Sequence, residues 1–497
     1  MPPTPRRLNA ALLATGAVLL AGCGSTVQFG AGISAGNMGS EGLPSTQSGA
    51  ATSSVGSGMT SPQNVRAIDA GGQSTSPPLT TSTPSSTPTI SATDPLAPGV
   101  SRSTIKIGYV YSSTASGVAG TFGIGIDNVD EPAMENAVAD DINKRGGILG
   151  HKVVLVGYDQ DAAQALNNPD AAAAQQCIAF TQDTLVFAVL TGFNDGLAQC
   201  LTKKGVMLIE SGGLVSGETQ SKYLYFAPSG VVDDSLEPGW AARMAATDYL
   251  TGWDAGVGAP SKTAKVKFGM IVVDQPRLRH KAALIRGELA KRGYLIDDAN
   301  VVITADNVTA VGAASQNAVL KFRGSGVTHV LGSALLFWEA AQNQGYHPRY
   351  NFDGLVPLAL AASTAPKGQL HGSQAIGWLP TQDVDNAQDP GAVSAAQKRC
   401  VAIMKAARQD LSSRTTLFVA LTKCEDLWTM EHVGALARVL TVPAVANAFG
   451  RLGAQPSTLT FDSRWSKDRR GSARVLADLT YNDACSCYSY GKARTTF

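Results

Sequence analysis

The chain is 497 residues long, and its 40 Lys and Arg residues almost balance its 39 Asp and Glu residues, giving a formal net charge of +1. This balance leaves no basic field for a nucleic acid, so no nucleic-acid partner is expected. The length exceeds what one hydrophobic core usually holds, so more than one folded lobe is expected.

The first residues have the pattern of an export signal. Arg6 and Arg7 precede an apolar run over 8–20, which is too short to span a bilayer permanently and is followed by Leu-Ala-Gly-Cys ending at Cys23. This segment resembles the lipobox of bacterial lipoproteins, which implies removal of residues 1–22, lipidation of Cys23 and anchoring on the outer face of the cell membrane. An ordinary secretory signal with a chance cysteine is the alternative.

Residues 24–100 are dominated by Ser, Thr, Gly, Ala and Pro. Such a segment buries too little apolar surface to offset the entropy lost on ordering, so a flexible tether is expected. It contains the pattern G-x-S-x-G at 32–36, which we interpret as coincidence because no strand precedes it and no helix follows it.

Beyond residue 100, short apolar segments typical of strands alternate with segments of helical periodicity. In chain order we expect a strand over 105–110, a helix over 131–144, a strand over 152–158, a helix over 169–182, a strand over 185–190, a helix over 196–203, and strands over 206–210 and 266–273. A helix over 280–292, a strand over 301–303, a helix over 313–322, a strand over 329–331 and helices over 337–344 and 417–440 follow. This alternation predicts an α/β fold with parallel sheets flanked by helices.

Four segments carry a resemblance to a known family. They are "IKIGYVYSSTASG" from Ile105, "ADDINKRGGILGHKVVLVGYDQDA" from Ala139, "CIAFTQDTLVFAVLTGF" from Cys177 and "KKGVMLIESGG" from Lys203. Their order and spacing resemble type I periplasmic solute-binding proteins, in particular the branched-chain amino acid and amide binders of ABC transporters. Gly146 and Gly147 are the most specific feature, because they end a helix and start a tight turn before a strand.

The resemblance implies two Rossmann-like lobes joined by three crossing segments, with the ligand in the cleft between them. We expect lobe 1 to comprise 101–228 and 375–472, and lobe 2 to comprise 229–374 and 473–497. The crossings are expected near 225–230, near 373–380 and within 473–483.

The candidate ligand-binding residues follow the carboxyl ends of the expected strands, where loops and helix N-termini offer polar groups. In the family such loops bind a ligand carboxylate and amine. Where relatives usually carry a tyrosine this chain has Arg277, which suits an anionic group or else is solvated in the next helix. The Ser, Thr, Asn and Gly candidates also have a plainer interpretation as turn or helix-cap residues. Asp353 could equally be a turn residue, and Trp338 could simply pack in the second lobe. The candidates are Ser112, Ser113, Thr114, Thr191, Phe193, Asn194, Ser211, Gly212, Asp274, Arg277, Ser333, Trp338 and Asp353.

Six cysteines remain once Cys23 is set aside, and an even number in an exported chain favours disulfides. The family resemblance favours a bond between Cys177 and Cys200. Cys400 and Cys424 lie on two expected helices. Cys485 and Cys487 could close on each other or form a reactive or metal-binding pair, so their connectivity stays open.

No catalytic motif stands out. The six histidines lack metal-like spacing, no phosphate-binding loop occurs, and neither a cofactor nor a metal is expected. The resemblance implies a monomeric, non-enzymatic binder of a small polar metabolite with an ABC permease as partner. A ligand-sensing or protein-binding envelope module of the same fold is the alternative, and an exported enzyme rests only on the tolerance of the fold.

Overall fold

The computed structural model describes residues 96–120, 127–332, 335–389 and 394–497, which belong to one compact unit. The signal segment, Cys23 and nearly all of the expected tether lie outside these residues. Hydrogen bonding to the first strand begins slightly before residue 100, because the Lys106 amide donates to the Gly99 carbonyl at 2.8 Å. The last residues assigned to the tether are therefore part of the fold.

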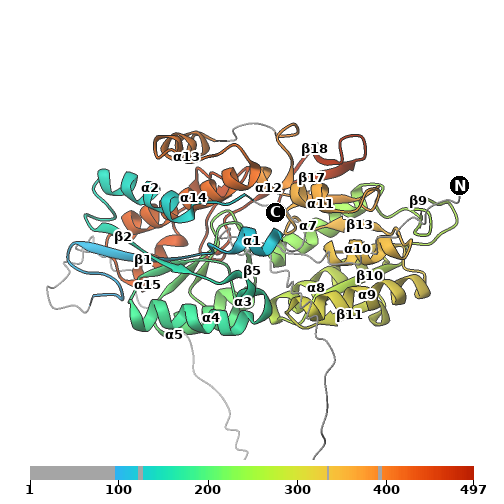
Figure 1. Ribbon diagram of the computed structural model, residues 1–497, viewed down its shortest axis with the longest axis horizontal. Coiled ribbons are helices and arrows are strands. Elements are labelled where there is room, and N and C mark those ends of the chain that lie inside the picture. The colour runs from blue at the N-terminus through green and yellow to red at the C-terminus, as the bar shows by residue number, and fades with distance from the viewer. Residues whose placement is uncertain (1–95, 121–126, 333–334, 390–393) are drawn as a thin grey trace, which may run out of the picture. The chain divides into compact units, whose positions relative to one another are not determined.

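The first sheet has five parallel strands in the order β2-β1-β3-β4-β6. Helices α1 to α6, with the π-helical turn 179–183, come from the same stretch of chain as these strands (Figure 1). The bounds are β1 (Thr104–Tyr111), α1 (Ala115–Gly120), α2 (Glu131–Lys144), β2 (Lys152–Asp159), α3 (Ala162–Asn167), α4 (Pro169–Ile178), β3 (Ala188–Leu190), α5 (Asp195–Lys203), β4 (Met207–Ile209), α6 (Gly217–Lys222) and β6 (Tyr225–Phe226).

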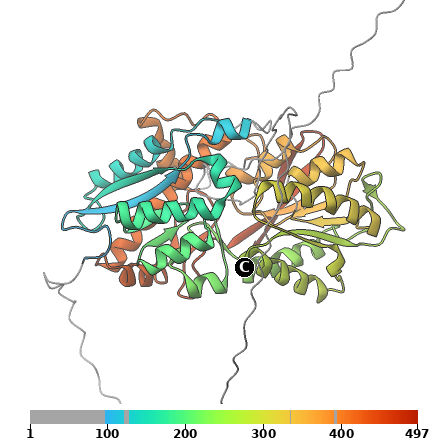
Figure 2. The ribbon, with the colours of Figure 1, turned by 60° about the horizontal axis from the view of Figure 1, so that its bottom comes forward.

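The second sheet has seven strands in the order β11-β10-β12-β13-β14-β17-β18, and only β17 runs antiparallel to its neighbours. Figure 2 shows the same elements from another side. The bounds are α7 (Asp233–Ala246), β10 (Phe268–Val273), α8 (Pro276–Ala290), β11 (Val301–Thr304), α9 (Val308–Ser325), β12 (His329–Leu331), α10 (Leu335–Asn343), β13 (Arg349–Phe352), α11 (Leu358–Thr364), β14 (Gln374–Gly377), α12 (Pro380–Asp383), β17 (Val475–Asn482) and β18 (Cys487–Thr496).

These two sheets confirm the predicted fold class. Most expected elements are present, with ends that shift by a few residues. The expected helix over 169–182 is interrupted, because α4 changes into a π-helical turn at Ala179. Helix α7 was missed, since Pro238 and Gly239 within it weaken the helical pattern.

The glycine pair behaves as the sequence predicts. Gly146 and Gly147 have φ angles of 105° and 72° directly after α2, and the Gly147 amide donates to the Ile142 carbonyl at 3.0 Å. A Cβ atom on Gly147 would lie only 2.1 Å from the His151 carbonyl oxygen. Glycine therefore serves here both the left-handed helix end and the close turn into β2.

Three later helices, α13 (Ala395–Ala406), α14 (Arg414–Ala437) and α15 (Val442–Phe449), pack with the first sheet's elements. Helices α13 and α14 contact α2, which lies far away in the sequence (Figure 1). Lys423 of α14 places its Nζ 2.8 Å from Glu131 and 3.2 Å from Glu135 of α2, and all three side chains are buried. Burial alone lowers the pKa of Lys423, but the two carboxylates outweigh it and raise that pKa.

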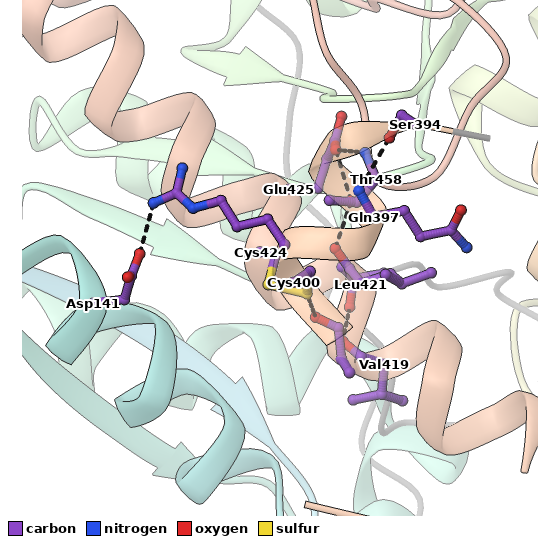
Figure 3. The surroundings of a disulfide bond; sticks show 12 residues. Asp141, Ser394, Gln397, Cys400, Val419, Leu421, Cys424, Glu425 and Thr458 are labelled. Carbon is purple, nitrogen blue, oxygen red and sulfur yellow. Dashed lines mark hydrogen bonds and ion pairs between the residues drawn. A yellow bond between two sulfur atoms is a disulfide. The ribbon is translucent and has the colours of Figure 1, made fainter. Parts of the chain in front are cut away.

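Three disulfides form among the described residues. Cys177–Cys200 joins α4 to α5, Cys400–Cys424 joins α13 to α14, and Cys485–Cys487 closes the turn between β17 and β18. Figure 3 shows the second bond beside Glu425, whose carboxylate accepts the Thr458 amide at 2.7 Å. Helix α14 is thus linked covalently to α13 and, through a buried carboxylate, to the segment that follows α15.

Among the described residues, no helix on its own is long and apolar enough to cross a membrane. The pair α14 and α15, bent by 106°, meets the length and composition requirements only when the two are taken together.

Segments that connect the two sheets meet at Ser229, a buried residue with a φ angle of 53°. Its amide donates to Ser472 Oγ at 2.8 Å, and its carbonyl accepts the Trp378 indole N–H at 3.0 Å. Its hydroxyl donates to Glu425 at 2.6 Å. Segments 225–232, 377–379 and 470–474 are therefore tied together at one residue, and the last of them overlaps the start of the range 473–483 expected for the third crossing.

Replacing this hydroxyl tests its contribution to stability. We expect Ser229→Ala to lower the free energy of unfolding by about 1–3 kcal/mol, because Glu425 would lose a buried donor. Urea unfolding of the full chain measures the change. Ser221→Ala, at an exposed serine on α6, should change stability by less than about 0.5 kcal/mol. Equal effects of the two variants would show that Ser229 has no special role.

Candidate functional site

A cavity lies at the carboxyl ends of β10, β12 and β13, where loops of parallel strands commonly bind ligands. It contains about 1050 Å³ of empty space, part of which is open to solvent. One side of its lining comes from α8 and the strand ends of the second sheet. Another side comes from 210–214, the loop that follows β4 of the first sheet. The cavity is therefore lined by both sheets' connections.

Arg277 links these two sides. It lies in the first turn of α8, is only 6% exposed, and lines the cavity. Its Nη1 donates to the Leu214 carbonyl at 3.3 Å, and its guanidinium lies 4.7 Å from the centre of the Phe193 ring. Its buried Nε has no hydrogen-bond partner among the described residues. A cation with an unused donor is thus present in the wall of the cavity.

Lys281 lies one helical turn after Arg277 and is the second cation of the site. It forms a close ion pair with Asp353, and its Nζ lies 3.7 Å from Glu237 of α7. Burial lowers the pKa of Lys281, while Glu237 opposes this shift. Burial also raises the pKa of Glu237 to about 7. Asp353 is consequently neutralised by the protein itself.

The remaining wall is largely apolar. Side chains from β10, α8 and the loops after β12, β13 and β14 line it, including Met270, Val272, Ile285, Leu331, Leu355 and Leu379. Trp240 of α7 contributes an aromatic face that lies 5.4 Å from Lys281 Nζ. The site therefore combines a small set of charges with room for an apolar group, as small-molecule sites commonly do.

Only part of the sequence-predicted set meets here. Gly212, Arg277 and Asp353 line the cavity, and Phe193 contacts Arg277 from the end of β3. Ser211 is adjacent but donates its hydroxyl to buried Asp426 at 2.6 Å. Arg277 is therefore neither solvated nor distant from the site, although it does begin a helix.

The loop after β1 does not line this cavity. The Ser113 amide and hydroxyl donate to Asp159 at 2.9 Å and 2.6 Å, and Thr114 Oγ1 accepts the Ala162 amide at 3.0 Å. The hydroxyl oxygens of Ser112 and Thr114 lie 3.2 Å apart. These side chains organise the carboxyl edge of the first sheet, as the plainer interpretation of turn and cap residues anticipated.

Four further candidates lie elsewhere, and a fifth lies outside the described residues. Asn194 caps α5 by accepting the Leu197 amide, and buried Thr191 continues the first sheet through its amide. Exposed Asp274 pairs with Arg279. Trp338 packs in the core of the second sheet against Tyr350 and Phe352, because α10 turns its apolar face inward. Ser333 lies outside the described residues.

Sequence reasoning missed Lys281, Glu237 and Trp240. Lys281 was detectable, because it follows Arg277 by four residues and so lies on the same face of a helix. Glu237 and Trp240 depend on α7, which was not predicted. The apolar wall left no signal of its own, since its residues also fit an ordinary core.

One group of potential metal ligands occurs among the described residues. Asp233 and Asp234 of α7 and His280 of α8 bring one ligand atom each within 4.8 Å of one another. The histidine spacing gave no sign of it, because α7 and α8 pack together only in the fold. Burial, together with the charge of Asp234, raises the pKa of Asp233 to about 7.

No protein-family model and no curated protein sequence matches the chain. Solved structures do match. An extracellular ligand-binding receptor from Verminephrobacter eiseniae gives a TM-score of 0.53 at 14% identity, over 78% of this chain and 100% of its own. A fatty acid ABC transporter substrate-binding protein from Thermomonospora curvata gives a TM-score of 0.55 at 13% identity, over 81% of this chain and 95% of its own. A leucine-binding protein from Thermotoga maritima gives a TM-score of 0.52 at 11% identity, over 79% of this chain and 99% of its own.

At these low identities, the structural similarity shows a shared fold alone. The chain has the architecture of type I periplasmic binding proteins, as the resemblance in the sequence indicated.

Asp383 gives the cavity wall a pH dependence. Its buried carboxylate accepts the Leu379 amide at 2.9 Å and the Tyr490 hydroxyl at 2.6 Å, and Leu379 lines the cavity. Burial raises the pKa of Asp383 from 3.8 to about 7. Asp383 therefore favours the folded state most at low pH, and this contribution is lost as pH rises through about 7.

We expect Asp383→Asn to remove this contribution. In the unmodified chain, the free energy of unfolding should decrease between about pH 5 and about pH 8, because Asp383 loses its proton. In Asp383→Asn this decrease should be smaller by on the order of 2 kcal/mol. Urea unfolding at the two pH values measures it. Exposed Asp140→Asn is the control and should leave the decrease unchanged. An unaltered pH dependence in Asp383→Asn would mean that Asp383 is ionised in the folded protein throughout this range.

Proposed function

We propose that the chain is an extracytoplasmic solute-binding protein that holds a small molecule in this cavity and delivers it to an ABC importer. The observation that carries the proposal is the contact of Arg277 with the 210–214 loop, because it puts groups from both sheets around one cavity. A ligand that contacts both sides favours the closed arrangement by its differential affinity, and a permease can respond to closure.

The sheets and the comparisons support this function. We infer lobe 1 as 101–228 with 375–472 and lobe 2 as 229–374 with 473–497, with one adjustment. Because β14 (Gln374–Gly377) and the strands after residue 473 all belong to the second sheet, the second boundary moves to residue 378. Two similar structures are named for leucine and for a fatty acid. The ligand-sensing or protein-binding module remains the competing function, and it differs by having no permease.

A ligand screen tests the proposal. Amino acids, amides, short carboxylates and aromatic acids are added to the full chain, and the melting temperature is recorded. A ligand of the folded state at a concentration of 100 times its Kd adds about 2.7 kcal/mol of stability, so the melting temperature should rise with concentration. A bound ligand should also reduce the radius of gyration in X-ray scattering.

A blocked cavity provides the matched control. Ala282→Phe places a ring in the lining, whereas Ala283→Phe places the same ring on the exposed side of α8. We expect the first variant to lose the thermal shift and the second to keep it. Absence of any shift across the whole panel in the unmodified chain would favour the protein-binding module.

We infer that Cys23 is lipidated and holds the protein at the outer face of the membrane. The basic, apolar and small residues that precede Cys23 support this inference. In bacterial expression, Cys23→Ser should move the protein from the membrane fraction to the soluble extracytoplasmic fraction, because several acyl chains together give stable anchoring. A membrane-bound Cys23→Ser chain would contradict lipid anchoring and leave solute binding untouched.

A further inference from the structure

We propose that the cavity takes a monocarboxylate with an apolar body and no amino group, such as a branched or straight aliphatic acid, in preference to an α-amino acid. This inference rests on the proposed solute-binding function and specifies its ligand. Three features of the described cavity lining carry it: a buried cation with no carboxylate partner among those residues, two carboxylates that already have partners, and the apolar wall.

The first feature is Arg277. Arg277 is only 6% exposed, and its Nε has no hydrogen-bond partner among the described residues. No carboxylate of the described residues lies within ion-pairing distance of its guanidinium. The Leu214 carbonyl and the Phe193 ring are its neighbours, and neither neutralises its charge. A buried cation in this state is favourable only when an anion joins it. The planar fork of the guanidinium suits a carboxylate in particular.

The second feature is the state of the acidic side chains. An α-amino acid brings an ammonium group that requires a free carboxylate in the site. Asp353, the expected amine partner, is already paired with Lys281, and Glu210 accepts the Tyr225 hydroxyl. An added ammonium would thus lie near Arg277 and Lys281, and it would have to compete with Lys281 and Tyr225 for the two carboxylates of the described lining, Asp353 and Glu210, which is unfavourable in a buried site.

The third feature is the wall described above. Met270, Ile285 and Leu355 are among the apolar side chains that face the cavity, whereas charged lining residues are few. A hydrocarbon tail beyond the carboxylate would therefore displace water from apolar surface. Each added methylene that fits should tighten binding about threefold to fourfold.

The test compares leucine with 4-methylpentanoate, which has the same carbon skeleton without the amino group. Isothermal titration of the full chain should show 4-methylpentanoate binding at least about tenfold more tightly than leucine. Its methyl ester, which lacks the negative charge, should bind at least about tenfold more weakly than the acid. The ester comparison needs no change in the protein, so folding defects do not affect it.

Variants on α8 identify the cation responsible. Arg277→Met should weaken 4-methylpentanoate binding about tenfold to hundredfold, and Arg277→Lys should restore part of the loss. Arg279→Met removes an exposed arginine on the same helix and should leave affinity unchanged.

Each outcome separates the ligand class from the general function. Tighter binding of leucine than of 4-methylpentanoate, or equal binding of acid and ester, would overturn the proposed ligand class while leaving solute binding intact. Failure of acids, amino acids and amides alike would overturn both proposals. Unchanged affinity in Arg277→Met would exclude Arg277 as the anion partner.

Discussion

The arrangement of the cavity depends on how the chain passes between its two sheets. Near residue 229 three separate passages lie together, and Ser229 uses its amide, carbonyl and hydroxyl to bind Ser472, Trp378 and Glu425. Its left-handed backbone is unusual for a serine, so these bonds must compensate for a local conformational cost. A buried polar network that is fully satisfied is rigid, and it fixes where each passage begins.

Backbone hydrogen bonds connect the segment around Ser229 to the loop that lines the cavity. The Gly212 amide donates to the Pro228 carbonyl at 2.7 Å, and the Val231 amide donates to the Gly213 carbonyl at 3.0 Å. Residues 212–214 are therefore held by the first passage, although they follow a strand of the first sheet. The carbonyl of Leu214 is then available to Arg277 of α8. The contact that joins the two sides of the site thus follows from the geometry of the crossing.

The sequence predicts the repetitive part of this structure better than the site. Gly146 and Gly147 were identifiable because backbone conformation is a local property, and the alternation of strands and helices predicts parallel sheets. Ser113, Asn194 and Trp338 do follow strand ends, as the sequence predicts. Their side chains, however, form local hydrogen bonds or pack in the core, and so they stabilise the fold without lining the cavity. Which strand-end residues face a cavity depends on α7 and on the passages, and these are set by contacts between distant parts of the chain.

Buried charges in this protein fall into two kinds, and the difference bears on function. Lys423 lies between Glu131 and Glu135, so its charge is compensated within the protein and the group serves to hold α14 against α2. Lys281 is likewise compensated by Asp353. Arg277 is also buried, yet among the described residues its neighbours are a carbonyl and an aromatic ring. Folding alone would gain from replacing such a cation with an apolar side chain. Its retention beside an apolar cavity is best understood if the compensating anion is supplied from outside the chain.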